Sequence, residues 1–546
     1  MMRKLIAGFV FLVLALLLSA LALQDAPDPW EIIAPGIAYQ EFHLPAPNNV
    51  YVARMDRSNL NVTIDSSLAQ GKLSGAMETV RGMAARYDEA INYWGRSWGA
   101  RNKVAVAING FYYNMYTGIP QNGVMNSGWY AKRFDELGGN TGFAWKLDRS
   151  AFIGQCVYHN PDKQIVTFVT ASVTQLFDGI NVPRENDHLT IYTPQYDANT
   201  RTDNNGLEVL VEMTRTTSIL PSPAMATGYV REIHNNQGST PIPFDHIVLS
   251  ASGTARTALL AKVHLGDQVG ISQEITHYKT DCVTPLNLDW TKTYASLGGD
   301  FYFLQGGVVQ PSAEPGALER HPRTAIAFNS NYIYFVVVDG RDPYSSIGMT
   351  IEELAIFARD TLSATEGIAQ DGGGSSTMVI NGKLMNNTFC NINYCKSKIF
   401  LPLLNRSGTG LNGQDAAPNN LANSPGNEPA SPIVERPVAD GMMMIVVEPV
   451  EKSTKFTTGD PVVALSSTDL RLGPGTNYAT LASIPAGTPG VILTHLNNLN
   501  GVLAKGSLWW MVYFGAGWVG WAPEVSLIIQ MSSDISTRSG GTPVPK

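Results

Sequence analysis

The sequence predicts a catalytic domain of mixed α+β and α/β class, in which a mixed sheet with helices surrounds a strand–helix–strand unit, followed by a small all-β domain. Two observations support this fold class. Residues 332–387 contain an apolar run, an amphipathic helix pattern and a second apolar run. After residue 460 the chain shows short apolar runs separated by glycine, proline and asparagine, which is typical of a small β-domain.

The strand–helix–strand unit follows from its residues in order. Tyr332–Val338 is an apolar run rich in β-branched residues, as in a strand buried on both faces. Thr350 and Glu353 form a capping box at the start of a helix. Capping accounts for Glu353, so we do not assign it a catalytic role. Gly367–Gln370 is a second short strand. Two strands joined by a helix in one sheet run parallel, so their carboxyl ends lie at one edge.

Asp339 and Asp371 directly follow these two strands. Carboxylates at the carboxyl edge of such a sheet, where ligands usually bind, are candidates for a catalytic acid/base pair. No cluster of histidine and carboxylate residues has metal-ligand spacing, so no cofactor is expected, although the two aspartates leave a divalent cation site open.

A glycine-rich loop follows Asp371. Its glycines allow a close backbone approach to a ligand, and its N–H groups and hydroxyls suit anionic oxygens. The alternative is a merely flexible loop. The candidate phosphate-binding residues of this loop are Gly372, Gly373, Gly374, Ser375, Ser376 and Thr377. Asn381-Gly382 then predicts a tight hairpin.

The pattern Asp-Gly-Arg from Asp339, a Thr-x-x-Glu helix, and Asp-Gly-Gly-Gly-Ser-Ser-Thr-Met from Asp371 closely resembles the phosphodiester glycosidases, the family of the uncovering enzyme. The resemblance implies one catalytic domain over residues 34–448, in which 386–432 is an enlarged loop. It also implies hydrolysis of sugar-1-phosphodiesters.

The resemblance places three further residues at the site. Asn109 begins an Asn-Gly-aromatic segment like the one that lines the family's active site, although the family's second glycine is absent here. Arg323 lies in a Pro-Arg-Thr segment and is the preferred phosphate clamp, because a guanidinium pairs bidentately with phosphate. Arg341 is the second choice, with a pairing to Asp339 as its alternative role.

The amino-terminal residues predict export. Residues 1–22 combine Arg3-Lys4, an apolar run and Ala20-Leu21-Ala22, as in a secretory signal peptide, with an uncleaved anchor as the alternative. Four cysteines in an exported chain suggest two disulfides, Cys390 with Cys395 and Cys156 with Cys282. The net charge of −8 and the lack of a basic stripe argue against a nucleic-acid partner.

The carboxyl-terminal part is divided into a linker (449–460), a small β-domain (461–530) and a disordered tail (531–546). The Arg-x-Gly-Pro-Gly-Thr-x-Tyr opening at Arg471 and the Gly-Trp-Val-Gly-Trp strand ending at Trp521 resemble bacterial SH3-like domains. That resemblance implies a barrel that binds cell-wall peptide or glycan. The candidates for an aromatic binding platform are Trp509, Trp510, Trp518 and Trp521, although some of them must form the core of the barrel.

Together these observations predict a secreted or envelope-associated hydrolase that cleaves the C1–O bond of sugar-1-phosphodiesters in an exopolysaccharide, wall polymer or phosphoglycan. Two alternatives stay open. One is a metal-assisted phosphodiesterase acting on the same substrates, and the other is a non-catalytic protein that binds cell wall or glycan.

Overall fold

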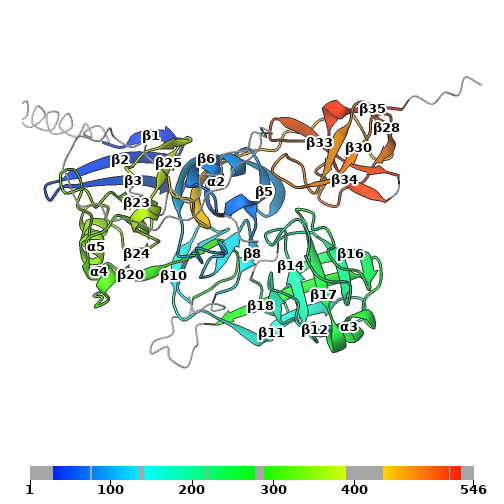
Figure 1. The fold of residues 1–546 in the computed structure, drawn as a ribbon, viewed down its shortest axis with the longest axis horizontal. Coiled ribbons are helices and arrows are strands. Elements are labelled where there is room, and N and C mark those ends of the chain that lie inside the picture. Colours follow the sequence, from blue (N-terminus) through cyan, green and yellow to red (C-terminus); the bar gives the residue numbers. More distant parts are fainter. Residues whose placement is uncertain are drawn as a thin grey trace, which may run out of the picture.

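The computed structural model describes residues 29–73, 77–134, 140–216, 219–276, 288–388, 435–515 and 517–530. The expected signal segment, most of the enlarged loop, the tail, and Cys282, Cys390 and Cys395 lie outside the described residues. The described chain is mostly β-sheet with few helices (Figure 1). The α/β character that we expected is therefore confined to a small part of the chain.

The first sheet contains the strand–helix–strand unit and has eight strands. In spatial order they are β1 (Glu31–Ala34), β2 (Ile37–Leu44), β3 (Asn48–Asp56), β23 (Tyr332–Val338), β22 (Arg323–Phe328), β24 (Glu366–Ala369), β20 (Asp300–Gln305) and β21 (Val308–Val309).

The two strands of the unit run in the same direction, but they are not neighbours. Both β23 and β24 pair antiparallel with β22, which lies between them. Every bonded pair in this sheet is antiparallel, so the mixed sheet that we expected around the strand–helix–strand unit is wrong here, whereas the parallel pair of strands 179–180 and 189–192 makes another sheet of the same domain mixed. The carboxyl ends of β23 and β24 still share one edge, about 10 Å apart across β22.

Helix α5 (Ile351–Asp360) connects these strands and covers one face of the sheet. Its capping box is confirmed, because the Thr350 hydroxyl accepts a hydrogen bond from the Glu353 N–H and the Glu353 carboxylate accepts one from the Thr350 N–H. Leu354 and Ala358 pack on Val52 and Val336 of the sheet. Burying this apolar face is what stabilises so short a helix.

Two smaller sheets pack on the other face and enclose the largest core. One has β26 (Lys383–Leu384), β25 (Met378–Ile380), β6 (Ser97–Asn109), β27 (Asp440–Glu448) and β4 (Val62–Leu68), with β5 (Ile91–Trp94) paired to β6. The other has β10 (Ala151–Gly154), β9 (Gly142–Lys146), β19 (Thr293–Gly298), β7 (Val124–Asn126) and β8 (Trp129–Lys132). The predicted hairpin is confirmed, since Asn381 and Gly382 both have positive φ between β25 and β26.

A second eight-stranded sheet has its own core. Its strands, in order, are β12 (Val173–Leu176), β11 (Tyr158–Phe168), β18 (Gln268–Thr276), β16 (Ala226–Asn235), β15 (Leu207–Met213), β17 (His246–Ala251), β14 (Leu189–Tyr192) and β13 (Gly179–Ile180). The other α-helices among the described residues are α2 (Val80–Tyr87), α3 (Gly253–Leu260) and α4 (Pro315–Leu318).

The last sheet is formed by the carboxyl-terminal residues alone. Its strands are β28 (Pro461–Ala464), β29 (Thr468–Arg471), β30 (Thr480–Ile484), β31 (Pro489–Ile492), β32 (Val502–Ala504), β33 (Ser507–Phe514), β34 (Trp518–Pro523) and β35 (Leu527–Ile529). Trp509, Trp510 and Trp521 are buried and belong to the core, and of the four candidate tryptophans Trp518 alone, at 43% exposed, is available to an aromatic platform.

The carboxyl-terminal sheet packs against the rest of the chain. Trp509 and Trp521 share one apolar cluster with Ile91 of β5 and with Phe244, which precedes β17. In Figure 1 these strands accordingly lie beside the sheet that contains β16 and β17. The carboxyl-terminal strands are thus docked on the body of the protein.

Candidate active site

The predicted site residues lead to a cavity of about 530 Å³ at the carboxyl end of β24. Asp371 and three arginines from separate segments line it together with the first part of the glycine-rich loop. The lining residues are Tyr112, Met115, Phe301, Gly316, His321, Arg323, Arg341, Gln370, Asp371, Gly372, Gly373, Gly374 and Arg436.

Asp371 is the carboxylate of this cavity. Burial raises the pKa of Asp371 to about 6, although a hydrogen bond from Ser375 and the charges of Arg436 and Arg341 act in the opposite direction. The Ser375 hydroxyl donates to Asp371 Oδ2 over 2.6 Å. A carboxyl with this pKa is ionised at neutral pH and is still basic enough to accept a proton.

The glycine-rich loop begins with a turn of 3₁₀ helix, Gly373–Ser375. Gly373 has φ +63°, and the Arg341 guanidinium lies so close that a Cβ on Gly373 would sit 3.0 Å from its Nη2. A side chain at this position would therefore displace Arg341. The loop brings its backbone to the cavity wall, as the sequence predicted.

The hydroxyl residues of the loop lie elsewhere than we expected. Ser375, Ser376 and Thr377 are all buried and none lines the cavity. The Ser375 hydroxyl is bonded to Asp371, and the backbone N–H groups of Ser375 and Ser376 donate within the turn. The assignment of these three residues to phosphate binding is therefore wrong for this arrangement.

Asn109 is a positioning residue. It ends β6, is fully buried, and its Nδ2 donates to the Asp371 carbonyl over 2.7 Å. Its Oδ1 accepts hydrogen bonds from the Thr324 hydroxyl and the Thr377 N–H. Asn109 thus ties both ends of the glycine-rich loop to β22, and our prediction that it contacts substrate is wrong.

Arg323 is only partly available to a ligand. Its Nε donates to the Met349 carbonyl over 2.8 Å, and its Nη2 donates to the carbonyls of Gly316 and Glu319. A bidentate grip on phosphate through both terminal nitrogens would break these bonds. Arg323 therefore supplies positive charge to the cavity wall and holds the α4 segment, which differs from the predicted clamp.

Arg341 and Arg436 complete the positive wall. Arg341 is exposed and has φ +63°, so the backbone turns sharply after β23. Arg436 lies over the Tyr113 ring at 5.9 Å. Both side chains lower the pKa of Asp371. Sequence analysis missed Arg436, because its segment reaches the site only through the pairing of β27 with β6.

Asp339 does not share this cavity. It is 3% exposed, and its carboxylate accepts hydrogen bonds from the Tyr51 hydroxyl, the Asn386 amide and the Asn387 N–H, at 3.0 to 3.2 Å. Burial raises the pKa of Asp339 to about 6. Its oxygens are surrounded by donors from Tyr51, Asn386 and Asn387. The predicted acid/base pair is therefore wrong.

Asp440 is a second carboxyl that the sequence did not reveal. It begins β27 and is 1% exposed, and its Oδ1 accepts the Phe111 N–H over 2.9 Å. Burial, with a smaller contribution from the charge of Asp371, raises the pKa of Asp440 well above its usual value. A neutral Asp440 beneath the loop lets Asp371 ionise without a second negative charge beside it.

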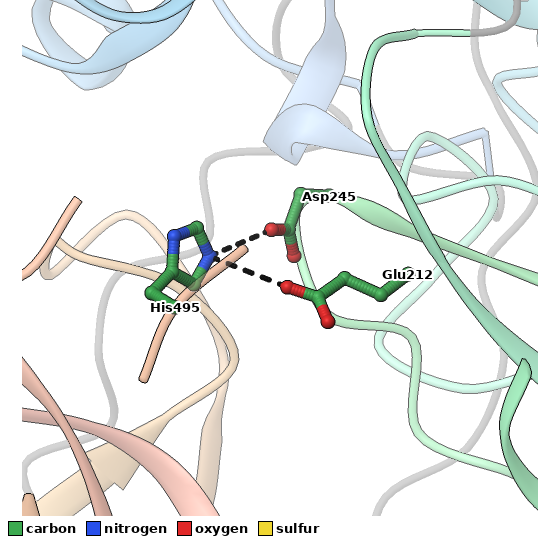
Figure 2. Close-up of side chains that lie close together, drawn as sticks. All are labelled: Glu212, Asp245 and His495. Atoms are coloured by element: carbon green, nitrogen blue, oxygen red, sulfur yellow. Dashed lines mark hydrogen bonds and ion pairs between the residues drawn. The ribbon is translucent and has the colours of Figure 1, made fainter. Parts of the chain in front are cut away.

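A separate group of possible metal ligands lies at the carboxyl-terminal sheet. Figure 2 shows His495 between Asp245 and Glu212, and its Nε2 is 2.8 Å from Asp245 Oδ2. The Leu499 N–H donates to His495 Nδ1, so Nε2 carries the proton and donates to Asp245. In this structure the group forms a hydrogen-bonded contact between the carboxyl-terminal sheet and the body of the protein.

Two other sequence predictions meet the structure only in part. Cys156 is disulfide-bonded, but the other three cysteines lie outside the described residues, so the pairing stays a prediction. Within the described part of the chain, no helix has the length and apolar character needed to cross a membrane.

Comparison with known proteins gives a family model and several distant structures. A putative exported protein from Burkholderia pseudomallei K96243 is 17% identical over 73% of this chain and 74% of its own, with a TM-score of 0.41. A hypothetical protein from Synechocystis is 14% identical over 77% of this chain, with a TM-score of 0.45, and this chain covers 64% of its length.

The catalytic domain of zebrafish N-acetylglucosamine-1-phosphodiester alpha-N-acetylglucosaminidase, auto-inhibited by its pro-peptide, is 12% identical over 77% of this chain and 84% of its own. Its TM-score is 0.34. No curated protein matches the chain. Residues 225–399, which include Arg323, Arg341 and Asp371, match the family model described as phosphodiester glycosidase.

Proposed function

We propose that this protein is a hydrolase that cleaves the C1–O bond of sugar-1-phosphodiesters. The main support for the proposal is that Asp371, whose pKa is raised to about 6, lines the same cavity as Arg323, Arg341 and Arg436. The family match over residues 225–399 supports the same reaction class.

The three arginines suit the leaving group. A phosphodiester carries one negative charge, and the phosphomonoester that leaves C1 gains a second as the bond breaks. Guanidinium groups fixed in the cavity wall stabilise this developing charge, and they do so without reorganising during the reaction. Arg341 and Arg436 contact the phosphate, and Arg323 contributes through Nη1, because its Nη2 and Nε are bonded to carbonyls.

Asp371 acts on the attacking water. The water oxygen forms a bond to C1, the C1–O bond to the phosphate breaks with its electron pair, and the proton released by the water passes to the Asp371 carboxylate. The raised pKa brings this group close to the pH at which the reaction runs, which favours general-base catalysis. Asn109, which holds the Asp371 carbonyl, and Ser375, which holds its carboxylate, keep the side chain aimed at the cavity.

The wider setting is also part of the proposal. The substrate is a phosphoglycan, an exopolysaccharide or a cell-wall polymer, met outside the cell after export. The reaction needs no cofactor. The carboxyl-terminal β-domain is SH3-like and binds cell-wall peptide or glycan.

The test is to identify the broken bond. The purified protein is incubated with a UDP-sugar and with a glycan-linked sugar-1-phosphodiester in oxygen-18 water. Mass spectrometry then determines which product contains the oxygen-18 label. Label in the anomeric hydroxyl of the released sugar is the expected result. Label in the phosphate would replace the proposal by a phosphodiesterase, whose metal dependence a chelator would reveal. No product from a broad panel would favour a glycan-binding protein.

A further inference from the structure

A second cavity lies beside the one at Asp371, and we call it the adjoining cavity. Its volume is about 350 Å³. Residues of β20 and of the segment 310–314, between β21 and α4, form most of its wall. Pro311 and Glu314 in this wall are exposed, so the cavity opens to solvent. Its volume lies within the range of about 300–1,000 Å³ that is typical of small-molecule sites.

Phe301 lies on the boundary between the two cavities. Its side chain lines both of them, and its ring extends toward Gly316 of α4, which belongs to the wall of the cavity at Asp371. Tyr112 also lies near this boundary. Burial raises the pKa of Tyr112 to about 12, and the charges of Asp371 in one cavity and of Asp300 in the other act in the same direction. The two cavities are therefore parts of one cleft, divided by the Phe301 ring.

The backbone of β20 is distorted at this boundary. Phe301 has φ of +45°, a conformation that bulky residues rarely adopt. The register of β20 against β24 shifts between Asp300 and Tyr302, so Phe301 is the extra residue of a bulge. Bulges and strained residues are concentrated at functional sites, where they change the direction of a side chain. Here the distortion places an aromatic ring between two cavities.

Polar side chains dominate the wall of the adjoining cavity. They include Gln155, Asp300, Gln305, Gln310, Ser312 and Glu314.

Two of these residues are half-buried and have a side-chain oxygen that is open to a ligand. Asp300 Oδ1 accepts the Phe301 N–H, and Gln310 Nε2 donates to the Val308 carbonyl. Within the described part of the chain, the other oxygens, Asp300 Oδ2 and Gln310 Oε1, have no hydrogen-bond partner. Both accept hydrogen bonds and therefore suit the hydroxyl groups of a ligand.

The two cavities differ in charge. Three arginines line the cavity at Asp371, which suits a phosphate. Among the residues that the structure describes, no lysine, arginine or histidine lines the adjoining cavity, whereas Asp300 and Glu314 are carboxylates. A phosphate or an acidic sugar would be repelled there. An uncharged sugar fits better, because its hydroxyls donate to the open oxygens and its C–H face packs on the Phe301 ring.

We propose that the adjoining cavity is a subsite for a second, uncharged sugar residue, which is linked to the sugar whose C1–O bond is cleaved. The phosphate and the first sugar occupy the cavity at Asp371, and the second sugar lies beyond the Phe301 ring. The natural substrate is then a phosphodiester of an oligosaccharide and not of a single sugar. This inference rests on the function proposed for Asp371, which places the first sugar.

The test compares substrates that differ by one sugar. The C1 methyl phosphodiesters of glucose, galactose, mannose and N-acetylglucosamine are compared with the same compounds extended by one neutral hexose at O3, O4 or O6. We expect kcat/KM of at least one disaccharide compound to exceed that of its monosaccharide parent about tenfold, as for one or two additional net hydrogen bonds. Equal values of kcat/KM for every pair of compounds would overturn the subsite.

Two variants then locate the preference for the longer compound. Gln310→Ala removes one open acceptor, and Asp300→Asn removes the charge while keeping an oxygen that accepts the Phe301 N–H. Each should lower kcat/KM for the disaccharide compound about fivefold, as for the loss of one net hydrogen bond, and leave the monosaccharide compound unchanged. Thermal unfolding shows whether each variant is folded. Two folded variants that keep the full preference would contradict the site.

The matched control is Gln40→Ala, which changes a half-buried glutamine of β2 that lines neither cavity. Its preference for the disaccharide compound should equal that of the parent protein. Loss of the preference in Gln40→Ala as well would mean that the effect is not local to the adjoining cavity and would overturn the proposal.

Calorimetry separates failure of the subsite from failure of the hydrolase. The same compounds are titrated into the Asp371→Asn protein with and without Gln310→Ala. If the parent protein hydrolyses no compound, but the disaccharides bind more tightly and Gln310→Ala removes this difference, the hydrolase proposal fails and the subsite stands. If hydrolysis occurs and neither kcat/KM nor affinity depends on the second sugar, the subsite fails and the hydrolase stands. Equal affinities without hydrolysis would overturn both.

Discussion

The regions around Asp371 and Asp339 start from the same pattern and reach different chemistry. Each aspartate follows a strand of one sheet and precedes a glycine, and burial raises the pKa of each to about 6. Asp371 borders an open cavity with three arginines. Asp339 is enclosed by the hydroxyl of Tyr51 and the N–H groups of Asn386 and Asn387.

The difference teaches that a shifted pKa does not by itself mark a catalytic group. At Asp339 the surrounding donors already occupy the carboxylate, and the side chain does not border the cavity that would hold a substrate. The Asn386 amide that contacts Asp339 also donates to the Ser376 carbonyl and accepts the Met378 N–H. Asp339 thus stabilises the far end of the glycine-rich loop, whose near end carries Asp371.

The largest expected effect separates the two aspartates. Asp371→Asn should lower kcat about 10²–10⁴-fold, the range found for loss of a general base. Asp339→Asn should keep hydrolysis within about tenfold of the parent, because its effect reaches the site only through the loop. Initial rates on one sugar-1-phosphodiester measure both. Equal losses of kcat in two folded variants would support the hypothesis that Asp339 and Asp371 act as a catalytic acid/base pair.

The arginines sharpen the same comparison. Arg436→Ala should lower kcat/KM about 10²-fold, as for the loss of one preorganised group that stabilises the transition state. Arg323→Ala should in addition lower the free energy of unfolding by about 1–3 kcal/mol, because three hydrogen bonds to carbonyls are lost, of which the one to Met349 is buried. Urea unfolding and steady-state kinetics measure the two effects. A stable Arg323→Ala protein with poor turnover would make Arg323 the clamp that the sequence predicted.

The pH profile should follow Asp371. Because the ionised form acts as base, kcat/KM should rise as pH increases through about 6. The Ser375 hydroxyl lowers the pKa of Asp371, so Ser375→Ala should move this acid limb to higher pH. An acid limb unchanged in Ser375→Ala would assign it to another group.

Much of the secondary structure around the site could be predicted from the sequence, because it depends on residues close together in the chain. The apolar run of β23, the Thr350 capping box of α5 and the Asn381-Gly382 turn each depend on residues close in the chain. The pairing of β22 with β23 is a hairpin closed by residues 329–331, but the pairing of β22 with β24 reaches across the whole of α5 and leaves no local signal.

The composition of the site was harder to predict for the same reason. Arg436 and Asp440 reach the loop only because β27 pairs with β6, which is more than 300 residues earlier in the chain. The roles of Asn109 and Arg323 depend on which carbonyls face them, and only the folded structure decides that. Family resemblance located these two residues near the site, but it did not show whether they contact the substrate or hold other parts of the site in place.

The smallest expected effect tests the enclosed aspartate through stability. The pKa of Asp339 is raised in the folded protein, so protonation favours folding, and this contribution is complete below about pH 4 and lost as pH rises through about 6. The difference between the free energies of unfolding at pH 4 and pH 7 should therefore shrink in Asp339→Asn by about 1–3 kcal/mol, as expected for a pKa shift of this size. Chemical denaturation of parent and variant at both pH values measures it. Burial also raises the pKa of Asp65 to about 6. Because Asp371 and Asp65 are unchanged in the variant, they contribute equally to both proteins, and the remaining difference belongs to Asp339. No difference would mean that its carboxyl is as well solvated by its donors as by water, and the contrast with Asp371 would then rest on access to the cavity alone.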